Sequence, residues 1–210
     1  MERENAAIIS FNWDLIIDEL LFSEQLDGKS YGFSREVSNG PVLLKPHGSL
    51  NWFEEEPGRY LKDEKKIRIF NSSSDGDIYA FSEFRAPISK AGRIYYPFIV
   101  PPVHLKRFKG DVFKTLWKNC TSVLSTAKRV VFLGYSMPSA DLHAQFIIRC
   151  GFDNQSQGEL IAGGDRAAAT GPAEVEIVNP DRSAAQRIAA VVGPKSDCHW
   201  ISTPAADWLS

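Results

Sequence analysis

Polar residues able to do acid–base and hydrogen-bonding chemistry follow directly after two apolar runs near the N-terminus. The run at 6–9 leads into Asn12 and Asp14, and the run at 42–44 leads into His47. Both runs are continuous rather than alternating, as in strands buried within a parallel sheet. Ligands of such sheets bind at the carboxyl ends of the strands, so we expect these three side chains to line one rim. A neutral imidazole at His47 suits a general base.

Two later segments repeat the arrangement of an apolar run followed by polar or small residues. The run at 130–133 precedes Gly134 and Ser136, and the run at 175–178 precedes Asn179. Strands therefore alternate with segments of helical periodicity, which favours an α/β fold with a mostly parallel sheet and right-handed crossovers.

Several further elements follow from hydropathy and capping signals. Apolar residues at helical spacing predict helices at 15–22, 107–127, 139–150 and 183–192. Ser139 is the expected N-cap of the third helix, with Leu142, Phe146 and Ile147 facing inward. Strands are predicted at 129–133, 174–178 and 198–201, and short alternating pieces occur at 67–70 and 78–81.

Four sequence elements, in this order, resemble motifs of SIR2-like domains. The similarity is greatest to the bacterial SIR2-like branch, known mainly as NAD-cleaving effectors of antiphage defence, and it covers about residues 6–182. The resemblance implies a Rossmann-like fold with helices on both faces of the sheet, and NAD as substrate or ligand. The motifs are SFNWD (10–14), KPHGSLNW (45–52), FLGYSMPSAD (132–141) and VEIVNPD (175–181).

The resemblance also implies roles for individual residues. Asp14 would hold the nicotinamide carboxamide, Asn12 would contact the ribose and order the attacking water, and His47 would be the base. Cleavage of this bond passes through an oxocarbenium-like state, in which the leaving group needs little acid catalysis. The residues implied to bind the nucleotide are Gly48, Gly134, Ser136 and Asn179.

Each of these residues also has an ordinary structural interpretation. Asn12 and Asp14 are common at a strand end followed by a helix cap, and His47 is compatible with a core histidine that has its hydrogen bonds. Gly134 is compatible with close packing of helix on strand, and the sequence Asn179-Pro180-Asp181 with a turn.

The length of 210 residues is that of one domain, and we expect a single SIR2-like domain over 1–210. Residues 53–99 are interpreted as an inserted small subdomain or lid, and residues 152–173 as a flexible loop. SIR2-like domains begin with a strand and a Gly-rich turn that holds the dinucleotide phosphates. Nothing before Ser10 matches this unit, so we expect an N-terminally truncated domain that alone is weak or inactive.

Composition limits the partners. The formal net charge of −2 gives no general attraction to nucleic acid or anionic membranes. The three cysteines are far apart and lack zinc-site spacing, so we expect a reducing compartment and no zinc. A metal site built from His47, His104, His143 and Asp141 lacks the spacing of a helical zinc pair. The charged N-terminus is unlike a signal peptide, so a cytoplasmic location is expected.

Three functions are compatible with these observations. The first is an NAD⁺ hydrolase that releases nicotinamide and ADP-ribose. The second is a non-catalytic or degenerate SIR2-like module that binds NAD or an ADP-ribose-like nucleotide. The third, an NAD-dependent protein deacylase, is less favoured because the zinc cysteines of deacetylases are absent. A sheet lacking its first strand has an exposed edge, which favours a homo-oligomer or a further effector or sensor domain.

Overall fold

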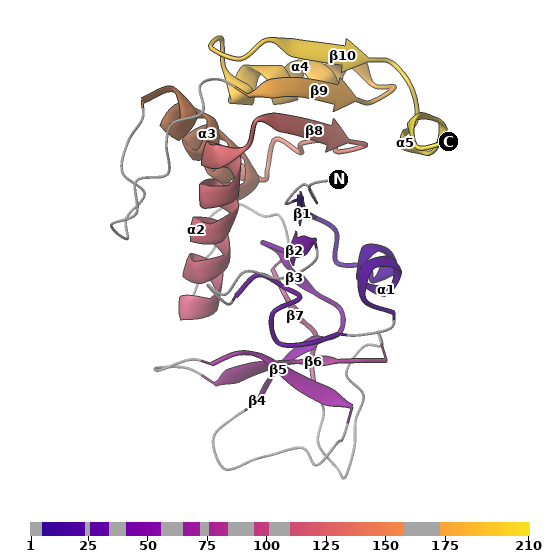
Figure 1. The fold of residues 1–210 in the computed structure, drawn as a ribbon, viewed down its shortest axis with the longest axis vertical. Coiled ribbons are helices and arrows are strands. Elements are labelled where there is room, and N and C mark those ends of the chain that lie inside the picture. Colours follow the sequence, from indigo (N-terminus) through magenta and orange to yellow (C-terminus); the bar gives the residue numbers. More distant parts are fainter. Residues whose placement is uncertain are drawn as a thin grey trace, which may run out of the picture. The chain divides into compact units, whose positions relative to one another are not determined.

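The computed structural model describes residues 6–23, 26–33, 41–55, 65–71, 76–83, 95–100, 110–157 and 173–210. Helices and strands alternate along much of the chain, which confirms the expected α/β class (Figure 1). The chain divides into two compact units. The first contains Met1–Pro101 and Lys106–Asn119, and the second contains Pro102–Leu105 and Cys120–Ser210.

The first unit begins with a short parallel pair of strands. Strand β1 (Ala7–Ile9) pairs with β2 (Val42–Leu44), with Ile9 opposite Leu44 at their carboxyl ends. Helix α1 (Ile16–Phe22) follows β1 at once. The expected strand and helix are confirmed, although the strand covers only three of residues 6–12.

The orientation of α1 is not what hydropathy suggests. Asp18 and Phe22 face the interior, whereas Ile16 and Leu20 are largely exposed. A buried carboxylate in place of an apolar side chain requires a cation or several hydrogen-bond donors nearby. The partners of Asp18 therefore define the interior of this unit.

Antiparallel strands complete the first unit. Strands β4 (Trp52–Glu55), β6 (Asp77–Phe81) and β5 (Lys66–Phe70) form a sheet in the order β4-β6-β5 (Figure 1). The predicted strand pieces at 67–70 and 78–81 lie within β5 and β6. Strand β3 (Gly48–Ser49) pairs with β7 (Phe98–Ile99). The subdomain or lid at 53–99 stays a prediction, and its segments 56–64, 72–75 and 84–94 lie outside the described residues.

Helix α2 (Asp111–Thr126) matches the strongest amphipathic pattern of the sequence. The boundary between the two units falls within it, after Asn119. The first three residues of the predicted helix, 107–109, lie outside the described residues. Its inward side chains are apolar, as the spacing predicts, and include Phe113, Leu116, Cys120 and Leu124.

The second unit is a βαβαβ arrangement followed by a short helix. Strands β8 (Arg129–Leu133), β9 (Glu174–Val178) and β10 (Cys198–Ile201) are parallel in the order β10-β9-β8 (Figure 1). All three match their predicted bounds. Crossovers of the same hand between neighbouring strands lie on one face of a sheet. The helices α3 (Leu142–Gln157) and α4 (Arg182–Val192) are in contact, as this predicts, and α5 (Ala205–Trp208) ends the chain.

Helix α3 begins and ends differently from the prediction. The Asp141 carboxylate, rather than Ser139, accepts a hydrogen bond from the backbone N–H of Ala144 at the helix start (3.3 Å). The helix continues past Cys150 to Gln157. Part of the segment predicted as a flexible loop, 152–157, is therefore helical, and residues 158–172 lie outside the described residues.

The buried face of α3 also differs from the prediction. Ile147 is buried as expected, but Leu142 and Phe146 are exposed. The buried face instead includes Gly151, where an added Cβ would overlap the Leu124 side chain of α2. Close approach of two helices selects a small residue at the contact, while larger apolar side chains such as Ile148 and Phe152 are buried elsewhere along α3. Within the described ranges, no helix is long and apolar enough to cross a membrane.

We predict that Gly48→Ala destabilises the protein more than Gly134→Ala. Both glycines have positive φ, +79° and +64°, which costs an alanine about 1–2 kcal/mol. An alanine Cβ at residue 48 would also overlap the backbone carbonyl of Phe98, whereas at residue 134 the nearest atom is the Ala205 Cβ at 3.6 Å. We expect urea unfolding to give a loss of at least ~3 kcal/mol for Gly48→Ala and about 1–2 kcal/mol for Gly134→Ala. Equal losses would contradict the steric argument.

Candidate functional site

His47 lies at the carboxyl end of the parallel pair in the first unit. Its ring is buried and packs edge-on against Phe11, with 5.4 Å between the ring centroids. The Nδ1 atom lies 3.4 Å from the backbone oxygen of Phe11. A carbonyl oxygen only accepts hydrogen bonds, so this contact favours the tautomer with hydrogen on Nδ1 and a lone pair on Nε2. Nε2 is then the nitrogen that can accept a proton.

Asn12 and Asp14 lie on the segment that His47 touches. The Asn12 residue is exposed, and its backbone N–H donates to the Ser10 hydroxyl (3.3 Å). One carboxylate oxygen of Asp14 accepts from the N–H of Ile16, the first residue of α1 (3.2 Å). The Asp14 carboxylate therefore accepts a hydrogen bond at the start of α1, as its ordinary structural interpretation predicts. Asp14 also lies two residues from Asn12 in the sequence. The structure thus brings three of the predicted site residues to one strand end.

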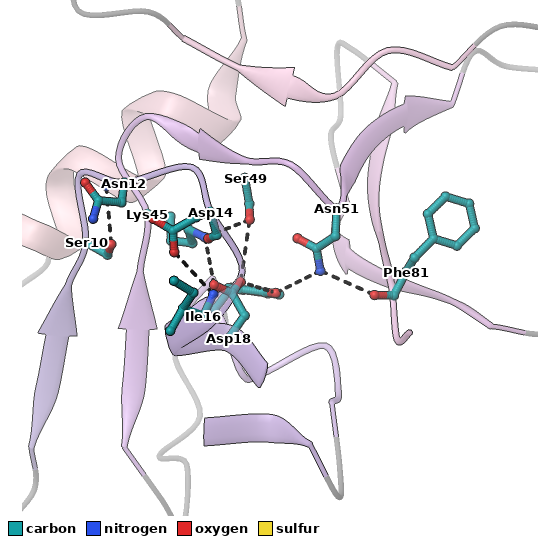
Figure 2. Close-up of polar contacts among 10 residues, drawn as sticks. Ser10, Asn12, Asp14, Ile16, Asp18, Lys45, Ser49, Asn51 and Phe81 are labelled. Atoms are coloured by element: carbon teal, nitrogen blue, oxygen red, sulfur yellow. Dashed lines mark hydrogen bonds and ion pairs between the residues drawn. The ribbon is translucent and has the colours of Figure 1, made fainter. Parts of the chain in front are cut away.

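A buried ion pair lies directly behind this strand end. Lys45 follows β2, and its ammonium donates to the Asp18 carboxylate of α1 at 2.7 Å. The two side chains are 1% and 0% exposed. The same ammonium donates to the backbone oxygen of Asp14 (2.6 Å) and to the Ser49 hydroxyl (2.8 Å), as Figure 2 shows. The three hydrogens of the ammonium thus have three acceptors.

The other oxygen of Asp18 continues the network. It accepts from the Tyr31 hydroxyl at 2.7 Å. The Asn51 amide donates to the Tyr31 oxygen (3.1 Å). It also donates to the backbone oxygen of Phe81 (3.3 Å), as Figure 2 shows. Lys45, Asp18, Ser49, Tyr31 and Asn51 are all buried, and we call these five residues the Lys45 network.

Burial and the charge of Asp18 act in opposite directions on the pKa of Lys45 and in the same direction on the pKa of Tyr31. Removal from water lowers the pKa of Lys45, and the negative charge of Asp18 offsets this in part. Burial is also the main cause that raises the pKa of the Tyr31 hydroxyl, and the charge of Asp18 raises it further. A neutral phenol and an ammonium both donate to Asp18, so the carboxylate is stabilised from two sides.

The backbone around His47 is held by neighbouring strands and by α2. The His47 carbonyl accepts from the N–H of Val100 (2.8 Å), next to the pairing of Gly48 with Ile99. The Trp117 indole donates to the Pro46 carbonyl (3.3 Å). The structure thus gives Gly48 a packing role beside β7, in addition to the nucleotide-binding role that the resemblance implies.

The remaining predicted residues lie in the second unit, after β8 and β9. Gly134 has positive φ and donates its N–H to the carbonyl of Val178 (2.9 Å). Asn179 is buried, and its amide donates to the Tyr135 carbonyl (3.0 Å) while its oxygen accepts from the Asp181 N–H (2.9 Å). Ser136 is exposed on the same loop. Asn179 therefore has hydrogen bonds within a turn, as its ordinary structural interpretation predicts.

Arg187 of α4 is a loop-holding residue that the motifs did not indicate. Its guanidinium donates to the carbonyls of Ser136 (2.8 Å) and Met137 (3.2 Å). Met137 is buried with a positive φ of 44°, an uncommon conformation for a residue with a side chain. Two donors from a rigid fork hold the loop after β8 in this conformation.

The Lys45 network was also missed in the sequence. A lysine at a strand end and an acidic residue in the first turn of a helix are both common in solvent. The local signal available was the position of acidic Asp18 among the apolar residues of 15–22, a segment that also contains Glu19. In the described part of the chain, no group of three or more His, Cys, Asp or Glu side chains is placed to hold a metal ion.

Comparison with known proteins gives one structural similarity. No family model matches the sequence, and no curated protein matches it at a significant level. A solved structure described as "Structural Basis for the Mechanism and Regulation of Sir2 Enzymes" aligns with 97% of this chain and 58% of its own, with a TM-score of 0.46 and 16% identity. The chain thus spans less than two thirds of that protein. The similarity is too low to assign a function.

The Tyr31 hydroxyl gives a prediction about alkaline stability. Its pKa is raised above the ordinary 10.0, so the folded state keeps a proton that the unfolded state loses. The stabilising contribution is fully present below about pH 10 and is lost as the pH rises further, at up to ~1.4 kcal/mol per pH unit. We expect Tyr31→Phe to remove this part of the pH dependence, measured by urea unfolding between about pH 9 and about pH 11.5.

Tyr96→Phe is the matched control, because Tyr96 is an exposed tyrosine of the same unit. It should keep the alkaline loss of stability seen in the wild type. The same alkaline slope in Tyr31→Phe and wild type would show that Tyr31 ionises normally in the folded protein.

Proposed function

We propose that this chain carries an NAD⁺ glycohydrolase site of the SIR2-like kind. In the reaction, water and NAD⁺ give nicotinamide, ADP-ribose and a proton. The observation that carries the proposal is the placement of buried His47 against Phe11, beside Asn12 and Asp14, at the shared carboxyl end of β1 and β2. An antiphage effector role and a cytoplasmic location remain predictions from the resemblance.

The chemistry divides among these three residues. The bond between nicotinamide and the ribose breaks first, because the leaving group is cationic and departs as a neutral molecule. Asp14 binds the carboxamide, and Asn12 contacts the ribose and orders the water. His47 accepts the proton from the attacking water or from a ribose hydroxyl at Nε2, while Nδ1 stays hydrogen-bonded to the Phe11 carbonyl. This arrangement resembles the orientation of a catalytic histidine by a fixed acceptor.

Each unit is proposed to offer nucleotide-binding groups at the residues that the resemblance indicates. In the first unit, Gly48 would allow close approach of a nucleotide beside His47. In the second unit, the exposed Ser136 hydroxyl and the backbone at Gly134 offer hydrogen-bonding groups on a loop fixed by Arg187, and Asn179 would contact a ribose. A Rossmann-like sheet belongs to the same proposal, and the parallel pairing of β1 with β2 and of β8, β9 and β10 supports it.

A second candidate is binding of NAD or an ADP-ribose-like nucleotide without turnover. One observation favours it, because an Asp14 carboxylate oxygen is already engaged by the N–H of Ile16. A carboxylate that caps a helix has less freedom to receive a carboxamide. Binding and cleavage are separated by measuring both on the same protein.

We predict that His47→Gln and Asn12→Ala each lower NAD⁺ cleavage by ~10²–10⁴-fold, because each removes a group that serves the transition state. Gln is used at residue 47 because it retains much of the buried volume. Nicotinamide release measures the turnover, and calorimetric titration with NAD⁺ measures binding. The melting temperature should change little for exposed Asn12.

His199→Gln is the matched control, since this histidine is exposed on β10 and has no place in the proposed chemistry. It should cleave NAD⁺ at the wild-type rate. Undiminished turnover by His47→Gln would remove His47 from the mechanism. Micromolar binding with no turnover by the wild type would instead select the binding-only function.

A further inference from the structure

Lys45 is a lysine without solvent access, which is uncommon because removal of an ammonium from water is costly. Its three acceptors are a carboxylate, a hydroxyl and a backbone carbonyl, all within 2.8 Å. A buried ion pair alone is weak evidence for a gain in stability. The arrangement of its partners therefore suggests a role besides stability.

The three acceptors of Lys45 belong to different segments. The Asp14 carbonyl ends the segment that follows β1, Asp18 lies in α1, and Ser49 lies in β3. His47 lies between Lys45 and Ser49 in the sequence. The contact between His47 and Phe11 is therefore made beside the place where the Lys45 ammonium links the segment 11–14 to the loop 45–49. Figure 2 shows the hydrogen bonds of this ammonium.

We propose that Lys45 is a positioning residue for the glycohydrolase site. Its ammonium fixes the distance between the segment 11–14 and the loop 45–49, and thereby the position of the His47 imidazole relative to Asn12 and Asp14. It does not contact the substrate, because it is fully enclosed by its protein partners. This inference rests on the proposed function, and it adds a residue that none of the motifs assigns.

The expected consequence follows from the sensitivity of catalysis to geometry. A misplacement of about 1 Å can lower a rate ~10²-fold. Lys45→Met keeps a side chain of similar length and removes all three hydrogen bonds. We expect kcat for nicotinamide release to fall ~10- to 100-fold, with KM changed less than about threefold.

Loss of stability must be separated from loss of position. Breaking a buried ion pair leaves Asp18 as an uncompensated charge, so Lys45→Met also destabilises the fold. The matched control is Lys66→Met in the same unit. The Lys66 ammonium lies 2.8 Å from each carboxylate oxygen of Glu55, whose side chain is nearly buried, so this variant also breaks an ion pair. Lys66 has no contact with the segments 11–14 and 45–49 among its described partners. It should lose melting temperature but keep kcat.

A double variant makes the separation sharper. Asp18→Asn combined with Lys45→Met removes both charges, so the penalty of an orphan carboxylate disappears and the melting temperature rises above that of Lys45→Met. The hydrogen bonds to the Asp14 carbonyl and to Ser49 stay absent, so kcat should stay low. A double variant that regains both the melting temperature and kcat would overturn the inference, as would wild-type kcat in Lys45→Met.

A readout without turnover distinguishes this inference from the proposed function. The ¹⁵N chemical shifts of the imidazole report which nitrogen carries the hydrogen, and His47→Gln assigns the signal among the four histidines. We expect the Nδ1–H tautomer in the wild type and in Lys66→Met, and a mixture in Lys45→Met and the double variant. If the wild-type protein neither binds nor cleaves NAD⁺, the glycohydrolase proposal fails. An unchanged tautomer in Lys45→Met would then also refute the positioning role.

Discussion

The first unit depends on one buried ion pair, that between Lys45 and Asp18. An ammonium and a carboxylate removed from water must each find several partners, and the partners found here come from β1, α1, β2 and β3 or the segments that join them. This requirement explains why α1 turns Asp18 inward and leaves Ile16 and Leu20 exposed. A polar constraint, rather than apolar burial, sets the rotation of this helix.

The loops that carry the proposed site residues are held in a common way. In each unit, side-chain donors bind backbone carbonyls at the ends of parallel strands. Lys45 binds the Asp14 carbonyl and Trp117 the Pro46 carbonyl, while Arg187 and Asn179 bind carbonyls of the loop after β8. Backbone that has left a sheet needs such partners. Residues fixed by them keep a constant position relative to the strand ends, which catalysis requires.

Much of the architecture was predictable from the sequence, because it depends on local patterns. The mainly apolar segments at 129–133 and 174–178 became β8 and β9, and the segment 107–127 with its helical spacing of apolar residues became α2. The inward face of α3 was not predictable in this way, since Gly151 is selected by close approach to Leu124 and has no hydropathy to indicate it. Asp141 rather than Ser139 begins that helix, a choice between two good caps that only tertiary packing decides.

The candidate site was predictable in part for the same reason. Asn12, Asp14 and His47 follow apolar runs and resemble motifs, so their proximity could be expected. Lys45 and Asp18 are 27 residues apart, and each alone has an ordinary surface interpretation. Only the pairing of β1 with β2 brings α1 and residue 45 together, and that long-range contact makes both residues internal.

The central claim is that the strand end holding Asn12, Asp14 and His47 receives NAD⁺. Titration of the ¹⁵N-labelled protein with NAD⁺, followed by backbone amide shifts, tests it most directly. The account predicts that the largest shifts in the first unit fall on residues 10–14 and 47–49, saturate with a single Kd, and are absent with an equal concentration of sodium sulfate. Shifts confined to other segments, or none at millimolar NAD⁺, would contradict it.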